Sequence, residues 1–151
     1  MRVLVTYADD DGAAATTARI IGDTLVLHGL ESTVRPVEQA PAGGYDAVVL
    51  GSTARSGHWL RRATRFAVAR EDSLRQVPVW LYSNSTAGDA LSPERHIDVD
   101  TVEDAVVPLD HHPFLPAHPA APAWTPHALD PDPGEVCGWA HQIAVALRSG
   151  T

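Results

Sequence analysis

The chain has 151 residues, a hydrophobic content of 44% and a net charge of -8. A chain of this length can bury roughly two-thirds of its unfolded surface in one core. Its strongly basic residues are all arginines, so the charge argues against nucleic acid or an anionic membrane as a partner, and Schiff-base chemistry is excluded. The single Cys137 excludes a disulfide framework, and the absence of a long apolar run or a signal-peptide layout predicts no membrane span and a cytoplasmic location.

Strand and helix patterns alternate from the amino terminus onward. Val3–Thr6 is a short β-branched run typical of a buried strand. A helix is expected next, ending near Gly29, with an apolar face made of Ala14, Ala18, Ile21 and Leu25. Ser32–Val37 alternates in polarity and contains Pro36, which favours a strand at the edge of a sheet.

The middle of the chain repeats this alternation. Ala47–Leu50 and Val77–Tyr82 are continuous apolar runs, which predict two further buried strands of a parallel sheet. A helix pattern lies between them, with one face made of Leu60, Ala63, Phe66, Ala67 and Arg70. Trp80, inside the second of these strands, is expected in the core.

The last third is less regular. Asp100-Thr101-Val102-Glu103 is expected to cap a short helix that ends before Pro108, and DHHPFL after it predicts an edge strand because it contains a proline. Residues 111–133 hold seven of the twelve prolines, so we expect an irregular segment there. Asp132-Pro133-Gly134-Glu135 has the signature of a helix start, and the apolar stripe of that helix is Val136, Trp139, Ile143 and Leu147.

These elements predict one α/β domain over residues 1–151: a doubly wound parallel sheet of five strands in the order 2-1-3-4-5, with helices on both faces. Ligands of such sheets lie outside the carboxyl ends of the strands. The loops expected there are Ala8–Ala14, Ser52–Trp59 and Ser83–Gly88, which are rich in small and polar residues.

Three segments of the chain resemble the flavodoxin-like domain in order and spacing: VLVTYADDDGAAATTA, YDAVVLGSTARSGHWL and VPVWLYSNSTAG. Within that family they are most similar to the branch of menaquinone-dependent protoporphyrinogen dehydrogenase, whose second loop has the form Gly-Ser-x-x-Tyr-x-Gly-His. The segment LDHHPF resembles that branch's Asp-His-x-x-Phe, and WAHQIAVAL resembles its closing helix.

The resemblance implies an FMN site in these loops. The residues it assigns to cofactor binding are Asp9, Asp10, Asp11, Gly12, Ala13, Ala14, Ser52, Thr53, Ala54, Arg55, Ser56, Gly57, His58, Ser83, Asn84 and Ser85. In the family the first loop holds the FMN phosphate with three hydroxyl residues, which correspond here to Asp9, Asp11 and Ala14. The aromatic residue that covers the flavin corresponds to Ser56.

These replacements predict that FMN binding is weakened or lost. Each hydrogen bond to a charged phosphate contributes about 1.5–3 kcal/mol, and a carboxylate about 4 Å from a phosphate repels it by ~1–4 kcal/mol. The amino end of a helix compensates by only ~0.3–1 kcal/mol. A loss of ~6 kcal/mol would turn a nanomolar site into one of tens of micromolar.

The acidic loop and the histidines have other interpretations. Asp9-Asp10-Asp11 can form the turn and cap the following helix, or its carboxylates can bind a divalent metal. His111, His112, His118 and His127 share one segment and could bind zinc. Neither pattern is specific enough to predict a metal site.

Two functions therefore remain open. In the first, the domain is a binding or assembly module that meets a protein partner through the proline-rich segment and Trp124. In the alternative, it is an FMN flavoprotein in electron transfer or quinone-linked oxidoreduction. A hydrolytic or proton-transfer enzyme built from the acidic loop and His58 ranks below both, because no nucleophile and base are paired in the sequence.

Overall fold

The computed structural model describes residues 1–10, 12–55, 58–85, 97–118, 120–122, 124–125 and 127–149. Within these ranges the strands are β1 (Arg2–Ala8), β2 (Glu31–Pro36), β3 (Ala47–Arg55), β4 (His58–Trp59), β5 (Val79–Ser85) and β6 (Asp110–Phe114). Parallel pairing gives the order β2-β1-β3-β5-β6, and the short β4 pairs antiparallel with the end of β3. Without β4 this is the predicted order 2-1-3-4-5.

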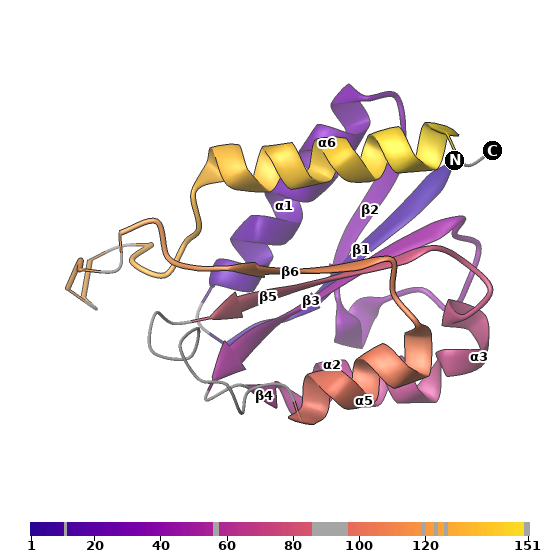
Figure 1. Cartoon of the computed structure of the whole chain (residues 1–151), viewed down its shortest axis with the longest axis horizontal. Coiled ribbons are helices and arrows are strands. Elements are labelled where there is room, and N and C mark those ends of the chain that lie inside the picture. Colours follow the sequence, from indigo (N-terminus) through magenta and orange to yellow (C-terminus); the bar gives the residue numbers. More distant parts are fainter. Residues whose placement is uncertain are drawn as a thin grey trace.

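Helices cover both faces of the sheet (Figure 1). On one face, α1 (Ala13–Leu27) and α6 (Pro133–Ser149) lie side by side. On the other face lie α2 (Arg61–Ala69), α3 (Glu71–Leu74) and α5 (Ile97–Val106), and a 3-10 turn, η1 (Val37–Gln39), follows β2. The prediction of a doubly wound α/β sheet is confirmed. None of the described helices combines the length and apolar character that crossing a bilayer requires.

Each face of the sheet has its own apolar cluster, because successive side chains of a strand point to opposite faces. Val5 and Val49 pack toward α1 and α6, whereas Leu4 and Leu50 pack toward α2 and α5. Burial on both sides explains why the central strands read as continuous apolar runs. The prediction that Trp80 and Trp139 belong to the core is confirmed, since both are buried.

The end of α1 follows from its sequence. Gly29 has φ 85°, a left-handed conformation that glycine adopts without strain. Leu30 N donates to Leu25 O at 3.1 Å and Gly29 N donates to Val26 O at 2.9 Å, which is the hydrogen-bond pattern of a Schellman motif. The predicted stop at this glycine is confirmed.

Some predicted boundaries were wrong. Ser52–Arg55 extends β3, His58–Trp59 forms β4, and Ser83–Ser85 extends β5, so much of two predicted loops is strand. The reason is pairing: Ser52, Thr53 and Ala54 are in register with Ser83, Asn84 and Ser85, and strand hydrogen bonds do not require apolar side chains. The helix expected to start at Asp100 begins at Ile97 instead, so this carboxylate lies near the start of α5 rather than capping it.

The proline-rich segment is irregular where it is described. After Phe114 and before Pro133, the described residues contain turns but neither helix nor strand. Ala117 N donates to Asp130 O at 2.9 Å, which closes the base of the segment as it extends beyond the end of β6 (Figure 1). Pro113 lies in β6 at the edge of the sheet, as predicted.

Candidate functional site

The loop after β1 is organised around one carboxylate, that of Asp9. Gly12 N donates to Asp9 Oδ1 at 2.8 Å, and Ala15 N donates to Asp9 Oδ2 at 2.9 Å. These amides belong to the amino end of α1, where backbone N–H groups lack helical partners and the helix dipole is positive. The carboxylate therefore takes the position at the helix end that favours an anion.

Two neighbouring elements hold this loop in place. Thr53 Oγ1 on β3 lies 3.3 Å from Asp9 Oδ1 and accepts a 3.4 Å hydrogen bond from Asp10 N. From α2, Arg62 donates to Asp9 O at 2.8 Å and forms a 3.7 Å ion pair with Glu38. The loop is thus bonded to β3 and α2 as well as to its own helix.

Seven of the sixteen residues predicted to bind the cofactor are buried. Ser52, Thr53, Ala54, Ser83 and Asn84 are buried on β3 and β5, while His58 is exposed and Ser85 is partly buried. Ala13 is also buried, at the start of α1. The backbone of Arg55 ends β3, and Asp11, Ser56 and Gly57 lie outside the described residues.

Ala14 was predicted to stand where the family carries a hydroxyl for the phosphate. It is fully buried in the cluster between α1, α6 and the sheet. A hydroxyl on this side chain would therefore face the core rather than the edge of the sheet.

A buried tyrosine on β5 also contacts the amino end of α1. Tyr82 on β5 is fully buried, and its hydroxyl donates to Ala14 O at 2.9 Å. Burial raises the pKa of this phenol well above its ordinary value, and the nearby charges of Asp9 and Tyr7 raise it further. Gly51 makes room for the ring, because a Cβ at that position would lie 2.0 Å from Tyr82 Cζ.

Solved structures share the fold of this chain. Rubredoxin oxygen:oxidoreductase of Desulfovibrio gigas has a TM-score of 0.71 and 12% identity, over 98% of this chain and 36% of that chain. A flavodoxin from the domain Archaea has a TM-score of 0.69 and 16% identity, over 98% and 99%. Flavodoxin 1 of Bacillus cereus has a TM-score of 0.66 and 15% identity, over 100% and 99%. The fold is flavodoxin-like.

The comparisons support the fold and no finer assignment. The chain spans about a third of the length of the D. gigas enzyme but nearly all of the two flavodoxins. No protein-family model matches the chain, and no curated protein does.

A hydrogen-bonded chain that the sequence did not predict runs under the carboxyl end of this flavodoxin-like sheet. Trp59 Nε1 donates to Ser83 Oγ at 2.7 Å, and Ser83 Oγ lies 2.7 Å from His111 Nε2. His111 Nδ1 lies 2.9 Å from Glu103 Oε1 on α5. Because a carboxylate only accepts, His111 Nδ1 donates to Glu103, and in the neutral ring Nε2 accepts from the serine hydroxyl.

The order serine, histidine and carboxylate is that of a nucleophile, its base and the group that orients the base. Ser83, however, is fully buried, and Trp59 already donates to its oxygen. A substrate cannot reach that oxygen in this conformation, so the chain acts as a structural tie between β4, β5, β6 and α5. Polar residues at Ser83 and His111 were visible in the sequence, but Glu103 enters from another element.

The histidines proposed as zinc ligands do not converge. His111 pairs with Glu103, His112 lies 2.9 Å from Glu135, and His127 lies 3.1 Å from Asp130. Among the residues that the structure describes, no three histidine, cysteine or acidic side chains are grouped as a metal site would require.

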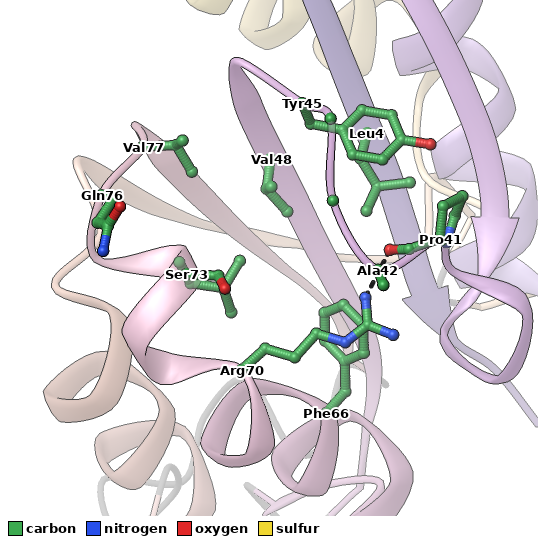
Figure 2. Close-up of a pocket in the computed structure, with 13 residues that line it drawn as sticks. Leu4, Pro41, Ala42, Tyr45, Val48, Phe66, Arg70, Ser73, Gln76 and Val77 are labelled. Carbon is green, nitrogen blue, oxygen red and sulfur yellow. Dashed lines mark hydrogen bonds between the residues drawn. The ribbon is translucent and has the colours of Figure 1, made fainter.

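A pocket of about 230 Å³ lies at the amino ends of β1 and β3, away from the loops considered above (Figure 2). Arg70 crosses its wall, donating to Pro41 O at 2.7 Å and Ala40 O at 3.1 Å with its guanidinium 4.5 Å from the Phe66 ring centre. These contacts occupy the arginine with the chain's own backbone. The volume is below the range of about 300–1,000 Å³ common for ligand pockets.

Proposed function

We propose that this flavodoxin-like domain has weakened or lost FMN binding and serves as a binding or assembly module. The observation that supports this is the position of the Asp9 carboxylate, which accepts hydrogen bonds from Gly12 N and Ala15 N. The resemblance described above assigns this loop to the FMN phosphate. An internal anion therefore occupies donors that a phosphate would need.

The energetic cost of replacing the Asp9 carboxylate with a phosphate is large enough to weaken FMN binding strongly. A phosphate entering the loop would have to displace the carboxylate from two donors, each contributing about 1.5–3 kcal/mol to a charged acceptor. It would also meet a like charge, at a cost of ~1–4 kcal/mol about 4 Å away. Together these terms reach the ~6 kcal/mol that separates nanomolar from tens of micromolar affinity.

The neighbouring polar side chains support the same conclusion. Ser52 Oγ accepts from Leu60 N at 3.1 Å and donates to Thr53 O at 2.9 Å. Asn84 Nδ2 donates to Thr17 Oγ1 at 3.0 Å, and Ser83 Oγ bonds to Trp59 and His111. These hydroxyl and amide N–H groups, predicted to wrap a ligand, thus bond to this chain itself, whereas the buried Asn84 Oδ1 has no hydrogen-bond partner among the described residues.

A module needs a surface for its partner, and we place it on the proline-rich segment. Trp124 has 82% of its surface exposed, although a tryptophan side chain is usually well buried in a protein that acts alone. Tryptophan is also among the residues that dominate the energy of protein interfaces. We therefore assign the partner contact to this side chain and its segment.

The deciding experiment is a titration of the purified protein with FMN, followed by flavin fluorescence. We expect a colourless preparation and no saturable quenching below tens of micromolar FMN. Asp9→Ser should bind FMN at least tenfold more tightly than wild type, because it frees Gly12 N and Ala15 N and removes the charge. Asp10→Ser is the matched control, since it removes a neighbouring charge but leaves both amides bonded to Asp9.

A yellow preparation, or saturation of the wild type at sub-micromolar FMN, would refute the loss of the cofactor. Equal FMN affinities of the Asp9→Ser and Asp10→Ser variants would show that the negative charge of the loop weakens FMN binding and that the amides bonded to Asp9 do not. The folded state of each variant is checked by circular dichroism before titration.

The alternative function is an FMN flavoprotein in electron transfer or quinone-linked oxidoreduction, as in the branch of menaquinone-dependent protoporphyrinogen dehydrogenase. The likeness to flavodoxins from Archaea and Bacillus cereus favours it. In that case Asp9 would swing away from α1, and backbone N–H groups of the loop would hold the phosphate in place of hydroxyl residues. The same titration separates the two functions.

A further inference from the structure

A pair of histidines lies between the two helices on one face of the sheet, far from the Asp9 loop in the chain. His28 is the C-cap residue of α1, and His141 belongs to α6. Their Nε2 and Nδ1 atoms are 3.1 Å apart, their ring centres are 4.8 Å apart, and the ring planes are inclined by 53°.

These two distances are consistent with a single shared ligand. If both nitrogens bind one ion at about 2.1 Å, a 3.1 Å separation corresponds to an N–metal–N angle of about 95°. Each ring centre lies about 1.15 Å behind its nitrogen, so the 4.8 Å between centres gives the same angle, about 95°. The two nitrogens also meet the geometry of a bent N–H···N hydrogen bond, so in the metal-free chain one ring donates to the other, and a bound ion would take the place of that proton.

We propose that His28 and His141 form a two-histidine site for a divalent transition metal, copper(II) or nickel(II), that clamps α1 to α6. An angle near 90° suits neighbouring positions of a tetragonal or octahedral ion, whereas tetrahedral zinc requires a wider one. Within the described ranges no third histidine, cysteine or carboxylate joins the pair, so water completes the coordination. The site is therefore a micromolar one rather than a structural metal centre.

The surrounding structure fixes the backbone that carries the two histidines. Gly29 and Leu30 close the Schellman motif directly after His28, and α6 packs along α1 through the buried residues of one cluster. The carboxyl end of α1 carries partial negative charge, which favours a cation beside its C-cap residue. The positive charge of Arg148 opposes the binding of a cation here, because its guanidinium donates to His28 O at 2.6 Å.

Cys137 is the neighbouring soft ligand that must be considered. It lies one turn before His141 on α6, but its Sγ contacts Thr24 Oγ1 at 3.6 Å, one turn before His28 on α1. The thiol therefore lies one helical turn away from the histidine pair, along the contact between α1 and α6. A Cys137→Ser variant tests whether it contributes.

The test uses the full chain without a histidine tag, treated with chelator and then titrated with copper(II) or nickel(II) in a calorimeter. We expect one ion per chain, and a copper electron paramagnetic resonance spectrum with coupling to two nitrogens. His28→Gln and His141→Gln should each weaken binding at least tenfold, and added nickel should raise the melting temperature of wild type more than that of either variant.

His118→Gln, an exposed histidine in the proline-rich segment, is the matched control and should bind as wild type does. No heat of binding at 100 µM metal would overturn the proposal. So would equal affinity of wild type and His28→Gln, or loss of binding in Cys137→Ser alone, which would assign the ion to the thiol. Because both histidine variants alter side chains that reach the surface, circular dichroism should show an unchanged fold.

Discussion

Tyr82 makes the stability of this protein depend on pH in a way that one substitution can isolate. The side chain is fully buried, with its hydroxyl bonded to Ala14 O at 2.9 Å. Burial, and then the charges of Asp9 and Tyr7, raise the pKa of this phenol well above its ordinary value near 10. Ionisation in the folded state would remove the donated proton and leave a charge without water.

The direction in which stability changes with pH follows from the linkage between proton binding and unfolding. Because the folded pKa is raised, the contribution is fully present below pH 10, where the unfolded phenol is protonated as well. Above pH 10 the unfolded chain releases the proton and the folded chain retains it, so stability falls as pH rises. By pH 11 the unfolded phenol at a pKa of about 10 is mostly ionised, and Tyr82 alone accounts for a loss of about 1.4 kcal/mol.

Tyr82→Phe removes both the hydrogen bond and the ionisable group. At pH 7 we expect the variant to be less stable by about 1 kcal/mol, the usual contribution of one buried hydrogen bond. That difference should fall to zero before pH 11 and be slightly reversed there, because only the wild type loses stability through this residue. The chain has no lysine, so few other groups titrate in this range.

The assay is urea unfolding of both proteins at pH 7, 9, 10 and 11, followed by tryptophan fluorescence. Tyr45→Phe, at a ring that is only partly buried, is the control and should keep a constant difference from wild type. A difference between wild type and Tyr82→Phe that stays the same from pH 9 to pH 11 would refute the reasoning. Absorbance at 295 nm of the folded protein reports independently which phenols ionise.

Two further predictions concern packing and partners. Gly51→Ala should destabilise the fold by about 3 kcal/mol or more in urea unfolding, because the new Cβ would lie 2.0–2.3 Å from three atoms of the Tyr82 ring. Gly138→Ala, where a Cβ meets nothing within 4 Å in α6, should instead be neutral or stabilising, and equal effects would contradict the packing argument. A photo-reactive residue at Trp124 should crosslink one discrete partner in cell extract, and the same residue at Leu27, itself 85% exposed, should not. Identical crosslinks from both sites would show that Trp124 and the proline-rich segment are not a specific partner surface.

Local signals predicted most of the fold. The strands at Val3–Thr6 and Ala47–Leu50 and the helix face of α1 depend on side-chain periodicity, which the chain carries residue by residue. Gly29 marked the end of α1 because the Schellman motif that ends this helix needs a residue with a left-handed backbone conformation, which glycine adopts without strain. Where prediction erred, at Ser52–Arg55 and Ser83–Ser85, polar composition indicated loops while pairing between neighbouring strands extended the sheet.

The candidate site was harder to predict because its contacts join distant parts of the chain. The spacing of Asp9 relative to Gly12 allowed either a helix cap or a metal ligand, and only the position of the side chain favours the cap. The chain from Trp59 through Ser83 and His111 to Glu103 draws on four elements. No pattern within any one of those elements indicates the others.

The sequence by itself determined the alternation of strand and helix, the doubly wound class and the edge placement of the strands that contain Pro36 and Pro113. Those properties arise from periodicity, backbone preferences and missing donors, which act within a few residues. The tertiary structure alone decided that Asp9 faces the amino end of α1 and that His28 meets His141. Such choices depend on which surfaces the packed helices and sheet bring within 3 to 4 Å, and no local propensity encodes that.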